Sequence, residues 1–355
     1  MSGATITEEN SRPQRATLYE VAEVAKVSKS TVSRVINDDA SVAQETRRRV
    51  LEAITITGYR VNQSARALAS RTTGAIALAI YEDLATYFSS EFSSSMVMAL
   101  QDFFFERDIQ VVLIPAPDQR RQLRIEQFIQ QRHVDGAILL GPVREDILLP
   151  DLLRDRVPLV ISGRTARTEN VTFVDIDNVG VSEDVVKGLA KLGRKQIGFI
   201  SGRLDNPAAT DRLLGYRRGL SAAGLDQTEG LIGIGDWGFK SAIAATEALI
   251  RNHPNIDALY CSNDLMASAA MQVLKAAGKS VPGDVALVGF DDTPMASSLN
   301  PKLSSVRQDP EIYAKSLGEL LLAQISEPNF TPQSQILPTQ ILWRESSGNP
   351  NNGQI

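Results

Sequence analysis

The clearest structural pattern in this chain of 355 residues is ATLYEVAEVAKVSKSTVSRVIN, residues 16–37. Thr17 is expected to cap a helix over 18–25, because Glu20 stands three residues later as in a capping box. Apolar residues recur in this helix at helical spacing and form one stripe. A second helix should begin after Ser28, another N-cap candidate, and continue to the end of the quoted stretch. The short KVS segment between the two helices predicts a tight turn.

A third helix is expected in TRRRVLEAITITG, residues 46–58, where apolar positions again lie on one face and a glycine stops the helix. Three such helices indicate a helix-turn-helix unit over residues 16–58. The polar face of the second helix fits the major groove of DNA, where Arg34 can donate two hydrogen bonds to one guanine. The alternative is a solvated helix face on a protein-binding module. The side chains expected to face DNA in this unit are Thr17, Ser28, Lys29, Ser30, Thr31, Ser33, Arg34 and Asn37.

Charge is distributed unevenly along the chain. The whole sequence carries 37 Lys and Arg against 42 Asp and Glu, a net charge of -5. Residues 1–72 hold 11 basic and 8 acidic residues, a net of +3, which leaves -8 for the rest of the chain. Only the N-terminal region therefore suits a phosphate backbone, where Lys and Arg replace condensed counterions. Taken alone, this charge is also compatible with an ordinary protein surface.

Beyond Gly74, short β-rich runs alternate with amphipathic helical stretches. The expected strands are 75–80, 109–115, 134–141, 157–162, 171–177, 195–202, 256–262 and 285–290, and the helices between them include 93–108 and 239–252. Near-continuous apolar strands separated by helices indicate parallel sheets covered on both faces. This length of alternation exceeds one comfortable core, so we expect an α/β fold with two doubly wound parallel-sheet lobes. Ligands in such folds bind at the carboxyl ends of the strands.

Several classes of function are disfavoured by what the sequence lacks. No window approaches 18 consecutive apolar residues and the N-terminus has no signal-peptide pattern, so we expect a cytoplasmic protein without a membrane partner. Cys261 has no second cysteine to bond, and His133 and His253 lie too far apart in sequence to suggest a zinc site. GIGDWG, residues 233–238, matches a dinucleotide fingerprint, but the bulky Trp237 stands where a pyrophosphate needs close backbone approach. We therefore expect no cofactor, no metal and no enzymatic activity.

The helix-turn-helix run, continued by ARALA within NQSARALAS at residues 62–70, resembles the DNA-binding headpiece of the lactose/galactose repressor (LacI/GalR) family of bacterial transcription regulators. The resemblance covers about residues 16–345 and is dense in the headpiece and diffuse in the core. It implies a hinge helix, a core similar to periplasmic sugar-binding proteins, and a homodimer on a pseudo-palindromic operator in double-stranded DNA. The positions that match the family's base-reading residues are Lys29, Ser30 and Arg34.

The polar segment 59–73 is the expected linker between headpiece and core. The resemblance implies a hinge helix here, in which Leu68 wedges into the minor groove at the operator centre. An apolar wedge unstacks one base step and kinks the DNA, a cost that the added contacts offset. The family usually has proline where this chain has Val61, so entry into the hinge is expected to be less rigid. The alternative is an amphipathic linker helix packed on the core.

The resemblance also implies a small effector, often a sugar or a nucleoside, bound between the two lobes. The matching positions are Phe88, Arg164, Asn206, Arg212, Trp237, Asp264 and Gln308. Carboxylate and guanidinium groups suit paired hydroxyls, and aromatic rings cover the apolar face of a sugar. Asp264 can equally cap the helix that follows it, and Gly163 stands where many sugar-binding relatives carry aspartate. The adjacent pair Asp291 and Asp292 is interpreted as a loop cap.

Together these patterns predict a dimeric repressor controlled by a small, sugar-like effector. The alternatives are a regulator controlled by a partner protein and a sugar or nucleotide enzyme with a DNA-binding headpiece. The helix with Met96, Met98, Leu100 and Phe103–Phe105 is a candidate for part of the dimer interface, with core packing as the alternative. The expected boundaries are a disordered leader 1–15, a headpiece 16–58, a linker 59–73, a first lobe 74–176 with 306–331, a second lobe 177–305 with 332–345, and a tail 346–355.

Overall fold

The structure is a computed structural model, and the residues it describes are 16–36, 39–59, 72–141, 149–165, 170–327 and 329–348. The chain divides into two compact units, Met1–Thr73 and Gly74–Ile355, each of which has its own core. Within the described ranges, no helix combines the length and hydrophobicity needed to cross a lipid bilayer.

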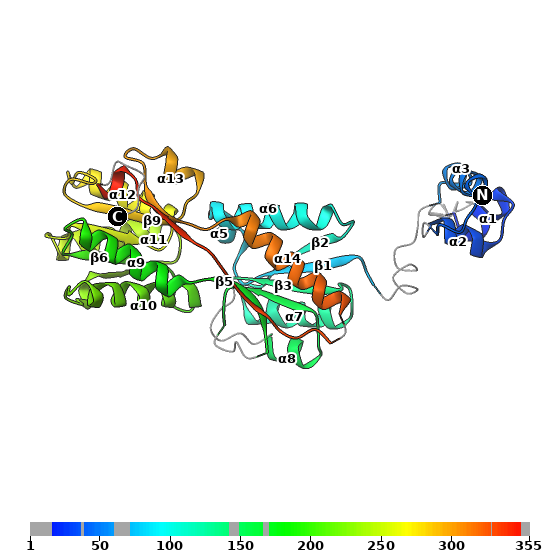
Figure 1. The fold of residues 1–355 in the computed structure, drawn as a ribbon, viewed down its shortest axis with the longest axis horizontal. Coiled ribbons are helices and arrows are strands. Elements are labelled where there is room, and N and C mark those ends of the chain that lie inside the picture. Colours follow the sequence, from blue (N-terminus) through cyan, green and yellow to red (C-terminus); the bar gives the residue numbers. More distant parts are fainter. Residues whose placement is uncertain are drawn as a thin grey trace, which may run out of the picture. The chain divides into compact units, whose positions relative to one another are not determined.

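The described part of the N-terminal unit contains three short helices, α1 (Leu18–Ala25), α2 (Lys29–Ile36) and α3 (Gln44–Thr57) (Figure 1). The predicted capping box is present: the Thr17 hydroxyl accepts from the backbone N–H of Glu20, whose carboxylate accepts from the Thr17 N–H at 2.6 Å. Helix α1 is capped by Lys26, whose left-handed φ of 53° turns the chain toward α2. The apolar faces of the three helices meet in a small core built around the fully buried Val21, Val32 and Val50.

The first lobe of the larger unit is a six-stranded parallel sheet. In spatial order its strands are β11 (Ser334–Leu337), β5 (Thr172–Ile176), β4 (Leu159–Ser162), β3 (Gly136–Leu140), β1 (Ala75–Ile80) and β2 (Gln110–Pro115). Helices α6 (Glu91–Phe105) and α14 (Pro310–Ser326) cover one face, and α7 (Gln119–Gln130) and α8 (Leu149–Arg154) cover the other (Figure 1). Short α5 (Leu84–Ser89) follows β1. Alternate residues of β1 pack into the hydrophobic clusters on opposite faces of the sheet, so the strand is buried on both faces. This burial explains why its sequence is continuously apolar.

The second lobe repeats this plan. Its strands, in spatial order, are β12 (Gln340–Leu342), β10 (Ser304–Arg307), β9 (Ala286–Asp291), β8 (Ala258–Cys261), β6 (Ile197–Ser201) and β7 (Ile232–Ile234). All pairs are parallel except β10 with β12. Its helices are α9 (Asn178–Lys191), α10 (Pro207–Ala222), α11 (Phe239–Asn252), α12 (Asp264–Ala276) and α13 (Pro294–Ser298), with 3-10 turns at Glu229–Leu231 and Glu345–Ser347. Helices α9 and α10 pack against each other, as do α11 and α12, so that the sheet is doubly wound.

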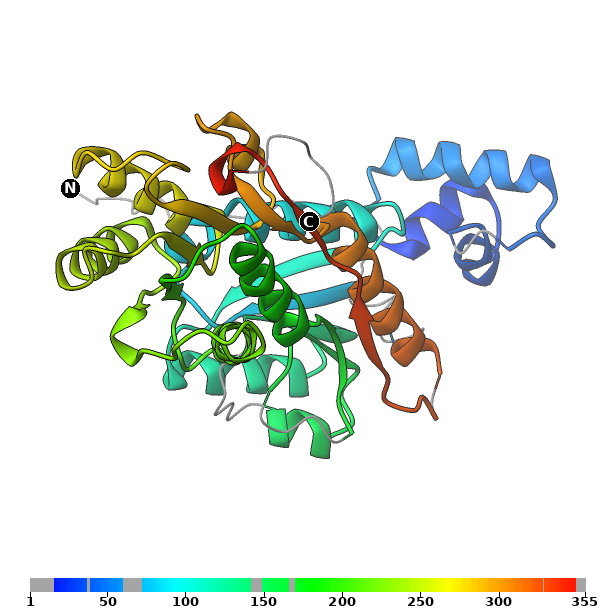
Figure 2. The same ribbon diagram turned by 60° about the vertical axis from the view of Figure 1, so that its left-hand side comes forward.

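Three segments connect the lobes. The second and third of these crossings lie a few residues later in the chain than predicted. The chain passes from β5 to α9, from β10 to α14, and from β11 to β12. The sequence placed 332–345 in the second lobe, but Ser334–Leu337 pairs in register with β5 of the first sheet. The third crossing therefore follows Leu337, and Figures 1 and 2 show this C-terminal red segment running from one lobe to the other. Residues 306–307, assigned to the first lobe, belong to β10 in the second.

Candidate functional site

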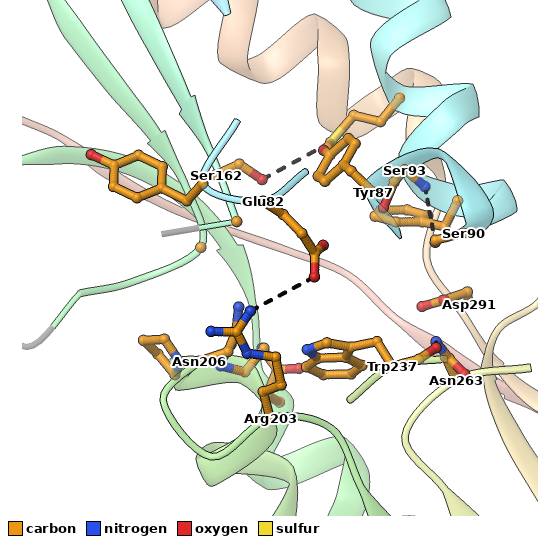
Figure 3. A pocket seen from close by; sticks show the side chains of 18 of the residues that line it. Glu82, Tyr87, Ser90, Ser93, Ser162, Arg203, Asn206, Trp237, Asn263 and Asp291 are labelled. Carbon is orange, nitrogen blue, oxygen red and sulfur yellow. Dashed lines mark hydrogen bonds and ion pairs between the residues drawn. The ribbon is translucent and has the colours of Figure 1, made fainter. Parts of the chain in front are cut away.

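A cleft between the two lobes lies at the carboxyl ends of the strands, where the α/β architecture leads one to expect a ligand. Figure 3 shows aromatic, hydroxyl, amide and charged side chains gathered around it. The residues of the first lobe that line it include Tyr81, Glu82, Tyr87, Ser90, Phe92, Ser93, Met96, Ser162, Arg164 and Asp175. Tyr313 of α14 also belongs to the first lobe, and the lining residues from the second lobe and the crossings include Asn178, Arg203, Asp205, Asn206, Arg212, Trp237, Asn263, Asp291 and Gln308.

Arg212 lies at the floor of the cleft and is 5% exposed. Its Nε donates to Asn178 Oδ1 at 2.8 Å, and its Nη1 donates to the backbone oxygen of Ser262. The guanidinium carbon lies 3.4 Å from the centre of the Phe290 ring and 5.6 Å from that of Trp237. Burial lowers the pKa of Arg212. The side chain is thus a fixed, largely desolvated donor group that faces the cleft.

Asp291 supplies the opposite charge and enters the cleft from the end of β9. Its backbone has the left-handed φ of 99°, which is unusual for a residue with a side chain. Gln308 Nε2 donates to the Asp291 carboxylate at 2.6 Å. Burial raises the pKa of Asp291 to about 6, and the charge of Arg212 opposes that rise. The interpretation of Asp291 as a loop cap missed this placement, although its position at a strand end was the signal that could have found it.

Asp264 does not line the cleft. Its carboxylate is buried and accepts from the Thr293 N–H at 2.7 Å, the Thr293 hydroxyl at 3.1 Å and the Ser305 hydroxyl at 2.6 Å. It is the first residue of α12, and the residue that caps this helix and lines the cleft is its neighbour Asn263. Asn263 Oδ1 accepts from the Met266 N–H, and Nδ2 donates to the Trp237 carbonyl. The sequence prediction therefore selected the wrong member of the Asn–Asp pair as a cleft residue.

Phe88 is the second predicted effector residue that the structure keeps out of the cleft lining. It is 37% exposed on α5, and its ring meets that of Tyr87 edge to face with centroids 5.7 Å apart. Tyr87 is buried and does line the cleft. The residue of α5 that lines the cleft is therefore Tyr87, one position before the predicted Phe88.

Arg164, Asn206 and Trp237 lie at the cleft as predicted, but two of them have structural partners. Arg164 forms ion pairs with Asp175 at 2.8 Å and with Asp211 of α10 in the other lobe at 2.7 Å. Asn206 caps α10 by accepting from the Ala208 N–H at 2.9 Å. The Trp237 indole is available as an apolar wall of the cleft, beside Arg212.

The described residues predicted to face DNA lie on α2 or just before it, except Thr17, which caps α1. Ser28 Oγ accepts from the Thr31 N–H at 3.1 Å, which fits its predicted role as the helix cap. Val32 and Val35 are buried, and Thr31 and Ser33 are half-buried. Exposed side chains on this unit include Thr17, Ser28, Lys29, Ser30 and Arg34. The remaining two, Asn37 and Leu68, lie outside the described residues.

Of the apolar side chains on α6 that suggested a dimer interface, Met96, Leu100 and Phe104 belong to the core. Met98 and Phe105 are 67% and 74% exposed. Among the described residues, no group of histidine, cysteine or carboxylate side chains has an arrangement that could hold a metal ion.

Comparisons with protein families match the two units to two family descriptions. Residues 17–62 match the bacterial regulatory proteins of the lacI family, and residues 186–347 match a periplasmic binding protein-like domain. The HTH-type transcriptional regulator CelR of Thermobifida fusca is 37% identical over 337 residues, covering 94% of this chain and 99% of CelR. Catabolite control protein A of Priestia megaterium is 30% identical over 334 residues, covering 93% of this chain and 99% of that protein.

Two solved structures are similar over nearly the whole chain. A complex of the transcriptional regulator CelR with cellobiose has a TM-score of 0.74 and 36% identity, covering 94% of this chain and 100% of that one. A lac repressor dimer bound to operator and the anti-inducer ONPF has a TM-score of 0.83 and 25% identity, covering 94% and 99%. The chain therefore belongs to the lacI family and is a DNA-binding transcriptional regulator with a periplasmic-binding-protein-like core.

Proposed function

We propose that this regulator is a repressor whose affinity for its operator is controlled by a sugar bound in the cleft between the lobes. The observation that carries this is the pairing of a fixed donor, Arg212, with a fixed acceptor, Asp291, beside the Trp237 ring. Sugar hydroxyls donate and accept at once, and the apolar face of the ring needs an apolar wall. The similar CelR structure contains cellobiose, which supports a sugar as the class of effector.

The cleft receives side chains from both lobes, so a bound sugar would contact two bodies that three chain segments connect. An effector shifts a conformational equilibrium only through different affinities for the two states. A sugar that touches both lobes gains contacts in the closed state and loses them in the open one. We infer that this difference is the source of its effect on operator binding.

On the DNA side, we propose that two copies of the chain read a pseudo-palindromic operator, with α2 in the major groove and Leu68 as the minor-groove wedge. The exposed Arg34 at the last turn of α2 is the candidate for guanine recognition. Arg34→Ala should lose about 1–3 kcal/mol on the specific operator and relax the preference at one symmetric base position. Equal weakening on operator and random DNA, at one salt concentration, would show that Arg34 contacts only phosphate.

A thermal-shift screen of sugars and nucleosides tests the effector class. A ligand at 100 times its dissociation constant should stabilise the folded state by about 2.7 kcal/mol. The Trp237 indole gives a second readout, since a ligand that covers it should change its fluorescence against that of Trp343, which is buried. Arg212→Lys keeps the charge but loses the planar fork, and it should weaken sugar binding about 10- to 100-fold. A sugar that binds Arg212→Lys and the wild type equally well would contradict this assignment of the cleft.

A further inference from the structure

The arginines of the cleft are already engaged by acidic or polar protein groups. Arg164 is held by the carboxylates of Asp175 and Asp211 at 2.8 and 2.7 Å. Arg203 forms ion pairs with Asp205 and, at 3.8 Å, with Glu82. An anionic ligand would have to displace a carboxylate from either arginine before it could use that cation.

The third arginine, Arg212, is engaged differently. Two of its nitrogens donate to Asn178 and to the Ser262 carbonyl, and Asp291 is the nearby charge that most favours its protonated form. Among the cleft residues that the structure describes, three arginines therefore face four carboxylates. These carboxylates belong to Glu82, Asp175, Asp205 and Asp291.

Glu82 is the carboxylate least compensated by its surroundings. It follows β1 at the first-lobe side of the cleft, and its side chain is 22% exposed. Figure 3 shows it pointing across the cleft toward Arg203 of the second lobe. Burial raises its pKa, Arg203 lowers it, and three neighbouring acids, Asp83, Asp236 and Asp205, raise it further. Glu82 and these three acids therefore make the electrostatic potential negative at this side of the cleft.

We infer that Glu82, with its partner Arg203, makes the cleft selective for uncharged polyhydroxylated effectors and against their phosphorylated or carboxylated counterparts. This inference rests on the proposed function and narrows its ligand class. Hydroxyl groups can donate to Glu82 and leave its ion pair intact, since a carboxylate accepts several hydrogen bonds. A carboxylate at neutral pH has no proton to donate to Glu82, a phosphate monoester is mostly dianionic, and Glu82 repels both. The Glu82 carboxylate therefore repels anionic ligands, and such repulsion of unwanted ligands is a common source of binding specificity.

The test compares neutral mono- and disaccharides, cellobiose among them, with their 6-phosphates and aldonic acids, which put the charge at opposite ends of the ligand. Affinities are measured by calorimetry for the full-length wild type, Glu82→Gln and the control Glu106→Gln. Glu106 is a carboxylate of the same lobe, 77% exposed and outside the cleft. In the wild type, the neutral sugar should bind at least 30-fold tighter than either charged analogue. Glu82→Gln should reduce that ratio about tenfold for at least one analogue, and Glu106→Gln should leave it unchanged.

Three results are distinguishable from the expected one. A charged analogue that binds the wild type within threefold of the neutral sugar overturns the selectivity. A wild-type ratio that survives in Glu82→Gln assigns the selectivity to other residues and overturns the role of Glu82. A protein that binds operator but no member of the panel refutes sugar control itself, and the selectivity falls with it.

Discussion

The protein should become less stable between pH 6 and pH 8, and replacing Asp264 with asparagine should remove most of this decline. Burial, followed by the charge of Asp291, raises the pKa of Asp264 to about 7, against 3.8 for an ordinary aspartate. A carboxyl group whose pKa is raised in the folded state holds its proton more tightly there than in the unfolded chain. Stability is therefore greatest at low pH and falls as the pH rises through the folded-state value.

The size of the loss follows from these values. Between pH 6 and 8 the unfolded chain has already lost the proton, whereas folded Asp264 releases nearly one full proton, which costs about 1.4 kcal/mol. Asp291, with a pKa of about 6, adds roughly 0.4 kcal/mol over the same interval. Asp264→Asn removes the first contribution and retains an oxygen that can accept from Thr293 or Ser305.

Urea unfolding at pH 6, 7 and 8, followed by tryptophan fluorescence, measures the effect. The wild type should lose about 2 kcal/mol across the interval, and Asp264→Asn only about 0.5 kcal/mol. Asp226→Asn, a change of the same kind at an exposed position, should behave as the wild type does. If Asp264→Asn shows the full wild-type decline, Asp264 is already ionised at pH 6 in the folded protein and the reasoning is wrong.

Three other substitutions have defined outcomes. Gly202→Ala places a Cβ against the Trp237 ring, which must move toward the cleft, so calorimetry should show at least a tenfold loss of sugar affinity with altered Trp237 emission. Arg164→Gln removes the ion pair to Asp211 that joins the lobes and should weaken sugar binding about two- to fivefold, as expected for a partly exposed pair. Asp211→Asn should weaken binding by the same factor. If the losses of the two single variants add fully in the double variant, the two side chains are not directly coupled. Thr17→Ala removes the cap of α1 and should cost about 1 kcal/mol, seen as faster hydrogen exchange in that helix, whereas Thr17→Ser should not.

The sequence was most informative where a local pattern alone determines the structure. The apolar stripe and capping box of the first helix predicted 18–25, and the structure has α1 at Leu18–Ala25. The predicted helix 239–252 coincides with α11. Eight strands were visible as largely apolar runs, and all of them except the edge strand β2 are mostly buried, because strands covered on both faces contain few polar residues.

Two of the strands that went undetected have too few apolar residues to stand out in the sequence. β10 has the sequence SSVR and β11 has SQIL, neither of which forms an apolar run. Ser304 of β10 is fully buried because its hydroxyl bonds Ser347 at 2.8 Å and accepts from the Arg344 N–H. Strand β11 pairs with β5, far earlier in the chain, and no local pattern announces this pairing, so the third crossing was misplaced.

At the cleft, two of the errors were shifts of one residue. Phe88 was chosen where Tyr87 lines the site, and Asp264 where Asn263 does. Residue types and approximate positions come from the pattern, but the direction of a side chain at a strand end depends on backbone angles. The positive φ of Asp291 is such a case, since no property of an aspartate in the sequence announces it.

The three crossings also determine the order in which the lobes can be completed during synthesis. The first sheet begins with β1 at Ala75, yet α14 and β11 emerge only after residue 309. The second lobe, between α9 and β10, lacks only β12 by then. At about 5–20 residues per second, the chain between α6 and α14 takes on the order of 10–40 s to make. For that time the face of α6 that later packs on α14 has no cover, so the sheet that begins first keeps an exposed apolar helix face until α14 has been made.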